Sequence, residues 1–177
     1  HHADPPFPPP GTDCFPTTTL NGFLTFSNPL FSGPISTQGP SRVRRDPENA
    51  GGSVPIELVQ MDLTGNAGAL GAVQIGITPL PTPPSTGQTS SEPPPGTFPA
   101  DSFFDVFFDV RTSLPAPNDK LHNQIPAHVA AILDNVPPKP GTAFSSLPLA
   151  VTQLVNTQGQ PVGQIQNIVH TIGPPRD

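Results

Sequence analysis

The chain has 177 residues, of which 13 are acidic and 7 are basic, so its formal net charge at pH 7 is -6. Phosphate backbones repel such a charge, which argues against a nucleic-acid-binding function, and no apolar run approaches the ~20 residues that a membrane span needs. The 29 prolines and 16 glycines raise the question of disorder. Low charge and clear apolar alternation instead predict a folded β-domain with many proline-rich turns.

The single cysteine, Cys14, excludes a disulfide within the chain. We expect Cys14 to be buried, with a cross-link to a second chain as the alternative. The chain begins at His1 without a methionine, which indicates either removal of a signal peptide or the remnant of a tag. With sparse lysine and abundant threonine, glutamine and proline, this start predicts a secreted or cell-surface protein.

Residues 1–16 carry six prolines, which favours an extended polyproline-type arm over a packed element. A stiff, extended segment loses little entropy when it docks, so we expect this arm to lie in a groove of a neighbouring copy of the protein. The expected interface residues are two phenylalanines and the proline run between them: Phe7, Pro8, Pro9, Pro10 and Phe15.

Proline cannot donate to a sheet ladder, so proline-free windows indicate where strands lie. The window 17–28 predicts a first strand. The proline-rich stretch 29–55 predicts a loop, in which a short edge strand could lie near Ile35 or Val43. The basic cluster of Arg42, Arg44 and Arg45 is expected in a solvated loop.

The next two strands are predicted at 56–63 and 72–78, because each shows apolar alternation. Residues 64–68 supply glycine and asparagine between them, which predicts a hairpin. Residues 79–97 contain seven prolines with serine, threonine and glycine, and are expected to form an exposed flap.

Residues 98–112 hold the strongest strand signal in the chain, with four phenylalanines inside six positions. One parity is wholly apolar and is expected to face the core: Phe104, Val106, Phe108 and Val110. The other parity alternates phenylalanine with aspartate: Phe103, Asp105, Phe107 and Asp109. This pattern predicts a central core strand with one buried face and one partly solvent-exposed face.

The C-terminal part predicts a short strand at 120–123 and another at 128–133, where a short helix is the alternative. Residues 149–155 and 162–172 flank an Asn-Thr-Gln-Gly-Gln turn and predict a second clear hairpin. About eight short strands and little helical periodicity indicate an all-β protein. We therefore expect residues 17–177 to form a single antiparallel β-sandwich or jelly-roll-like domain.

Three stretches together resemble a family of secreted bacterial proteins known only as a domain of unknown function. They are Pro99-Ala100-Asp101-Ser102-Phe103-Phe104-Asp105-Val106-Phe107, Leu121-His122-Asn123, and Gly163-x-Ile165 leading to Val169-His170. The resemblance spans roughly residues 12–175 and includes Phe15-Pro16-Thr17-Thr18 and Gly39-Pro40. It implies an exported, extracellular protein and implies no reaction.

Carboxylates and histidines are the candidates for chemistry. Asp105 and Asp109 would lie about 13 Å apart along one strand, farther apart than the roughly 5–9.5 Å of a glycosidase pair. A calcium site would need Asp101 and Asp119 to converge. The weak metal candidates are His1, His122 and His170, and His1 could chelate copper through its amine and ring, but structural roles are favoured. His128 is a further histidine of this kind, six residues after His122.

No nucleophile elbow, phosphate-binding loop or dinucleotide fingerprint occurs, so we expect no enzyme activity and no cofactor. The favoured function is an exported structural protein that assembles with copies of itself, for example into a filament. The alternative is a ligand- or metal-binding β-sandwich module of the cell envelope.

Overall fold

The computed structural model describes residues 10–27, 30–49, 52–77, 84–91, 98–134, 136 and 138–174. These residues form twelve β-strands and one 3-10 turn, η1 (Gly68–Leu70), and they contain no α-helix. The strands are β1 (Gly11–Ser27), β2 (Leu30–Arg45), β3 (Ser53–Asn66), β4 (Ala72–Ile77), β5 (Ser85–Ser91), β6 (Ala100–Val106), β7 (Phe108–Arg111), β8 (Lys120–His122), β9 (Ala127–Leu133), β10 (Ala143–Ser145), β11 (Val151–Val155) and β12 (Pro161–Ile172). Within the described residues, no helix has the length and apolar character to cross a membrane.

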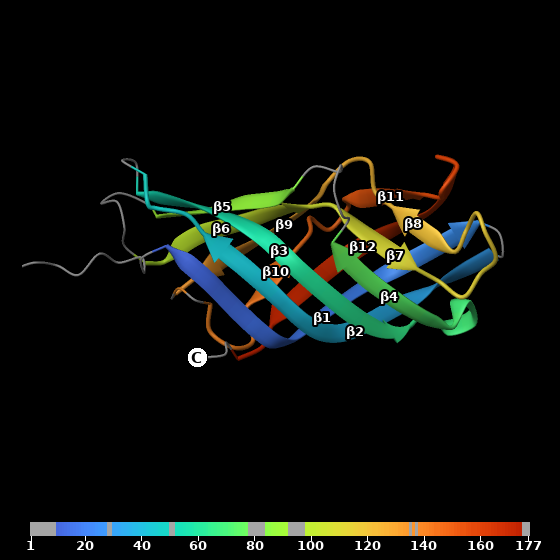
Figure 1. Ribbon diagram of the computed structural model, residues 1–177, viewed down its shortest axis with the longest axis horizontal. Coiled ribbons are helices and arrows are strands. Elements are labelled where there is room, and N and C mark those ends of the chain that lie inside the picture. The colour runs from blue at the N-terminus through green and yellow to red at the C-terminus, as the bar shows by residue number, and fades with distance from the viewer. Residues whose placement is uncertain are drawn as a thin grey trace, which may run out of the picture.

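All the strands belong to one antiparallel sheet that closes on itself, because β1 pairs with β2 on one side and with β12 on the other. The long strand β3 carries two shorter strands end to end on its far edge: β5 against 53–58 and β4 against 62–66. The same division into two short strands continues around the sheet. One half consists of β5, β6, β9 and β10, and the other half consists of β4, β7, β8 and β11. Both halves end by pairing with β12. Figure 1 shows β3 crossing in front of β12 at a steep angle, as strands on different sides of a closed barrel do.

The all-β, antiparallel class is therefore confirmed, but the eight-strand sandwich is too simple. Twelve strands occupy eight positions around a closed sheet, because four positions hold two short strands each. The two predicted hairpins are present: β3 pairs with β4 across η1, and β11 pairs with β12. The predicted strands at 120–123 and 128–133 correspond to β8 and β9.

The alternation in the phenylalanine-rich stretch is confirmed, since Phe104, Val106, Phe108 and Val110 are all buried, with exposed fractions from 1% to 7%. The stretch is two strands rather than one, because β6 ends at Val106 and β7 begins at Phe108. β6 pairs with β5 and β9, whereas β7 pairs with β4 and β8. The break at residue 107 is thus the point where the chain moves from one half of the barrel wall to the other.

The predicted loop at 29–55 is wrong for most of its length, because β2 runs without interruption from Leu30 to Arg45. Pro34 of β2 pairs in register with Phe23 of β1, whereas Pro40 of β2 and Pro16 of β1 are tolerated for a local reason. Pro40 has no register partner in either β1 or β3, and Pro16 of β1 has none in β2 or β12. Both prolines therefore lie where the ladders are interrupted, and their missing N–H groups break no regular hydrogen bond.

The predicted flap at 79–97 is wrong for residues 85–91, which form β5 between β3 and β6; residues 79–83 and 92–97 lie outside the described part. β5 shows no apolar alternation because its inward positions are Ser85, Gly87 and Thr89. A Cβ atom at Gly87 would lie 1.9 Å from the backbone oxygen of Phe103, so only glycine fits this close approach of the two strands.

The predicted arm at 1–16 is also wrong where it can be followed, because residues 11–16 belong to β1. Phe15, expected as an anchor for a neighbouring chain, is 1% exposed and packs in the core of its own barrel. Pro10 is exposed, whereas Phe7, Pro8 and Pro9 lie outside the described residues. Cys14 is half-buried rather than buried as expected, and the cross-link to a second chain stays a prediction.

Candidate ligand site in the barrel

An ion pair lies inside one end of the barrel, between Asp13 of β1 and Arg45 of β2. The Arg45 Nε donates to Asp13 Oδ2 at 2.6 Å, and Nη2 donates to Oδ1 at 3.0 Å. Each side chain is only 11% exposed. Strand alternation explains the inward direction, because Arg45 shares the parity of the buried Ile35 and Val43 in β2. The basic cluster was expected in a solvated loop, and for Arg45 this expectation is wrong.

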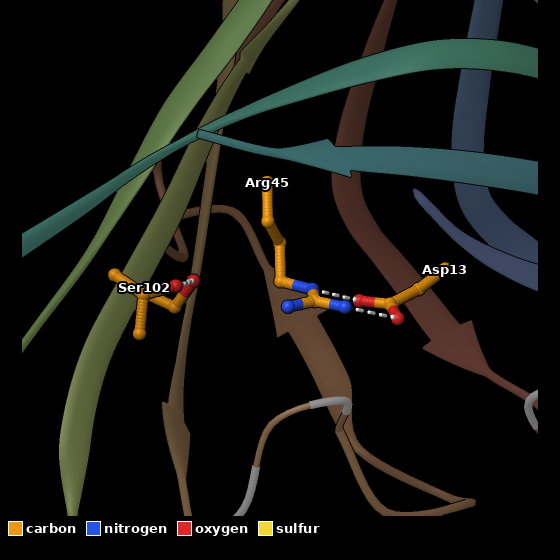
Figure 2. Close-up of polar contacts among 4 residues, drawn as sticks. Asp13, Arg45 and Ser102 are labelled. Carbon is orange, nitrogen blue, oxygen red and sulfur yellow. Dashed lines mark hydrogen bonds and ion pairs between the residues drawn. The ribbon is translucent and has the colours of Figure 1, made fainter. Parts of the chain in front are cut away.

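A second polar pair lines the same cavity as this ion pair. The hydroxyls of Thr89 in β5 and Ser102 in β6 are 2.9 Å apart and hydrogen-bonded, and the two residues are 3% and 2% exposed. Figure 2 shows Ser102 facing the Asp13–Arg45 pair from the opposite wall. Each of these polar groups has a partner within its own pair, so the cavity wall is polar at these points but holds no uncompensated charge.

We call the space between these pairs the lower cavity. Its volume is about 30 Å³. Apart from the two polar pairs, apolar side chains line it: Phe15, Val43, Ile56, Phe104, Leu133, Val136, Pro138, Phe144 and Ile172. Val136 and Pro138 follow β9 and are the part of this lining that comes from outside the strands.

A second space, which we call the upper cavity, has a volume of about 20 Å³. Its lining is apolar except for one residue: Leu20, Leu58, Met61, Val106, Phe108, Ala127, Val129, Ile168 and His170. His170 is 4% exposed, and its Nε2 is buried without a hydrogen-bond partner among the described residues. Burial disfavours the charged ring and lowers the pKa of His170 from 6.5 to about 4, so the ring is neutral at pH 7.

The two cavities are consecutive layers of the barrel interior. In β3, β6 and β12 the residue lining one cavity is two positions from the residue lining the other: Ile56 and Leu58, Phe104 and Val106, Ile172 and His170. Two residues advance a strand by about 6.6 Å. The cavities therefore form one column along the inside of the barrel, with an ion pair at one end and a histidine one layer above.

The other candidate residues lie on the outside of the barrel. His128 Nδ1 and Asp105 Oδ1 are 2.8 Å apart, and both side chains are about half exposed, at 53% and 41%. The Phe103 ring packs beside His128 with its centroid 5.2 Å away. His128 and Phe103 lie on an open outer face, in a shallow depression lined also by Ala130 and Ile132.

Asp109 and His122 are register partners on β7 and β8, and Lys120 Nζ lies 3.8 Å from the largely buried carboxylate of Asp109. His170 lies in the upper cavity instead, so the structure does not bring His122 and His170 together. No group of three or more histidine, cysteine or acidic side chains within the described ranges is placed to hold a metal ion. His1 lies outside those ranges.

Sequence reasoning missed Asp13, Arg45, Thr89 and Ser102. One signal was present: the alternation Ile35-x-Thr37-x-Gly39-x-Ser41-x-Val43-x-Arg45 places Arg45 on the inward parity of a strand. The prolines at 34 and 40 concealed it. For β5 the sequence carries no equivalent signal, because a strand of serine, threonine, glycine and glutamine resembles a loop.

The fold has a counterpart among solved structures. The chain is similar to DynF from the dynemicin biosynthesis pathway of Micromonospora chersina, with a TM-score of 0.78 over 96% of this chain and 83% of that one. The sequences are 19% identical, so the likeness shows the shared fold alone. No protein-family model matches the chain, and neither does any curated protein sequence.

Proposed function

We propose that this protein binds a small, largely apolar molecule inside its barrel. The observation that carries the proposal is the column formed by the lower and upper cavities, which is lined by buried aliphatic and aromatic side chains. Closed barrels of about eight strands are just wide enough to be filled by side chains or to hold one small ligand. A mostly apolar lining with a few placed polar groups is typical of small-molecule sites.

The charges in the column favour an uncharged ligand. Arg45 is matched by Asp13 at two points, and the lowered pKa of His170 keeps that ring neutral at pH 7. An ionised ligand would therefore bring an uncompensated charge into a low-dielectric interior, which is strongly unfavourable.

The cavities of about 30 and 20 Å³ are each large enough for a water molecule or two. A bound ligand must therefore displace side chains that now separate them. Met61 borders the upper cavity, and its unbranched, flexible side chain is suited to such repacking. We accordingly expect slow association, because binding is coupled to a change in the protein.

Fluorescence titration with the neutral, polarity-sensitive dye N-phenyl-1-naphthylamine tests the proposal, helped by the absence of tryptophan and tyrosine from the chain. Two alanines of β9 provide matched variants: Ala127 is buried and lines the upper cavity, whereas Ala130 is exposed on the outer face. Ala127→Leu should weaken dye binding several-fold and Ala130→Leu should leave it unchanged. Equal binding by both variants would mean that the dye does not enter the barrel.

Self-association of an exported protein is a second candidate, and it rests on the outer face around β9. All seven residues of β9 pair with β6, but within the described residues only Ala130 has a register partner in β10. Five large hydrophobic residues in and around this region are exposed: Ile125, Ile132, Leu147, Leu149 and Val151. An open strand edge beside apolar surface favours strand addition by a second copy.

Light scattering over a range of protein concentrations tests this second candidate. We expect the intact protein to associate and the variant Ile132→Lys, which places a charge on the outer face of β9, to remain monomeric. A monomer at every concentration for both proteins would exclude assembly through this face.

A further inference from the structure

The buried Nε2 of His170 is the only polar side-chain atom of the described residues found both fully buried and without a hydrogen-bond partner. Such an atom is unfavourable in a protein interior, and each instance calls for a partner that the chain itself does not supply. Since His170 lines the upper cavity, the missing partner would have to occupy that space.

A single water molecule is a poor partner here. A buried water is normally held by two to four polar groups, and roughly three is typical. Every other side chain around the upper cavity is apolar, from Leu20 and Leu58 to Ile168. A water hydrogen-bonded to His170 would therefore leave most of its own hydrogen-bonding capacity unused among hydrocarbon groups. An oxygen atom attached to an apolar skeleton has fewer unused hydrogen-bonding positions, and its skeleton contacts the surrounding hydrocarbon groups.

We propose that His170 is a specificity-determining residue and that the bound molecule is a neutral apolar compound carrying one hydroxyl or carbonyl oxygen, which hydrogen-bonds to Nε2. This inference rests on the proposed function of the barrel interior. A hydroxyl serves either tautomer of the ring, because it can donate to an unprotonated Nε2 or accept from a protonated one. A carbonyl oxygen serves the tautomer that carries the proton on Nε2.

The lower cavity defines where the rest of the ligand lies. Thr89 and Ser102 satisfy one another there, and Asp13 is paired with Arg45. That cavity accordingly offers apolar contacts such as Ile56, and the ligand's hydrocarbon part should extend into it. The oxygen would then lie one strand layer, about 6.6 Å, from the layer that holds the hydrocarbon end.

Competition against the dye with three probes of one carbon skeleton tests the inference: 5-nonanol, 5-nonanone and nonane. The measured quantity is the affinity of each oxygenated probe relative to nonane, in the wild-type protein and in His170→Leu. We expect this ratio to fall roughly 5- to 10-fold in His170→Leu, the worth of about one hydrogen bond. His170→Gln retains a hydrogen-bonding group and should recover part of the lost relative affinity. His128→Leu, on the outer face, should leave the relative affinity at its wild-type value.

Nitrogen NMR of the histidine rings gives a readout that a purely structural role would not alter. The Nε2 resonance of His170 should shift when 5-nonanol is added and should remain in place with nonane. If the probes bind but the affinity of 5-nonanol and 5-nonanone relative to nonane is the same in wild type and His170→Leu, the role of His170 is disproved while binding in the barrel stands. If neither dye nor probes bind to the wild-type protein, the proposed function fails as well.

Discussion

The side-chain oxygen of Asn123 accepts a hydrogen bond from the backbone N–H of Phe108 at 2.8 Å, at the point where β7 begins. The Asn123 Nδ2 donates to the backbone oxygens of Val106 at 2.8 Å and Ile125 at 3.0 Å. Asn123 is 2% exposed. One buried amide thus satisfies backbone groups on both sides of the break between β6 and β7, where the wall of the barrel divides.

Replacing Asn123 by leucine should therefore be strongly destabilising. The change leaves two buried backbone groups, the N–H of Phe108 and the carbonyl of Val106, without partners, and each such group costs about 1–3 kcal/mol. We expect the free energy of unfolding to fall by about 3 kcal/mol or more in urea denaturation. Gln124→Leu alters the exposed neighbouring side chain and should change stability by less than about 0.5 kcal/mol. Similar values for the two variants would contradict the bridging role of Asn123.

Phe104→Ala should cost about 3–5 kcal/mol of stability, because it removes a buried ring. Phe104 is 4% exposed and meets Phe144 edge-on, with ring centroids 5.3 Å apart. Phe103→Ala is the matched control on the outward parity of the same strand, and it should cost clearly less. Chemical denaturation of both variants measures the difference, and a nearly neutral Phe104→Ala would refute the inward assignment of this parity.

Removal of one partner of the Asp13–Arg45 pair should destabilise the protein by about 3–5 kcal/mol, since the remaining charge is left inside the barrel. Asp13→Ala is the simplest test. The double variant Asp13→Leu with Arg45→Met should recover most of the loss, because apolar groups of similar size leave no unmatched charge.

The pair of Arg44 and Glu57, with atoms 3.2 Å apart and a Glu57 side chain that is 21% exposed, provides the comparison for this prediction. Arg44 is 52% exposed, and Arg44→Ala should change the free energy of unfolding by less than about 1 kcal/mol. A loss for Asp13→Ala that is no larger than this would show that solvent screens the interior pair.

The lowered pKa of His170 predicts a pH-dependent stability. In the unfolded chain the ring takes up a proton as the pH falls below 6.5, whereas in the folded protein it does so only near pH 4. Between these values the unfolded state binds more protons, so the free energy of unfolding decreases as the pH decreases. The loss should approach about 3 kcal/mol at pH 4 relative to pH 7.

The comparison of wild type with His170→Leu isolates this effect from the carboxylates that titrate in the same range. The stability difference between the two proteins should shift in favour of His170→Leu as the pH falls from 7 to 4. His122→Leu is the control for loss of a histidine outside the barrel interior. A constant difference between wild type and His170→Leu across this range would show that His170 is not held neutral by burial.

The sequence by itself determined the fold class and the buried face of its strongest strand. From Phe104 to Val110 the apolar residues recur at every second position, and a period of two leaves a strand only one way to bury them. The two hairpins were equally predictable, because glycine and asparagine in short turns between alternating segments are local signals. These features depend on neighbours within a few residues.

The tertiary structure decided the closure of the barrel and the composition of its interior. Pro16 and Pro40 were predicted to interrupt strands, yet they lie at matched irregularities of β1 and β2, which only the pairing of the two strands reveals. Asp13 and Arg45 are 32 residues apart in the chain, and their inward direction follows from strands that the prolines concealed. Whether the Nε2 of His170 has a hydrogen-bond partner likewise depends on which side chains surround it. Those side chains come from distant segments, and local periodicity does not reveal contacts between distant segments.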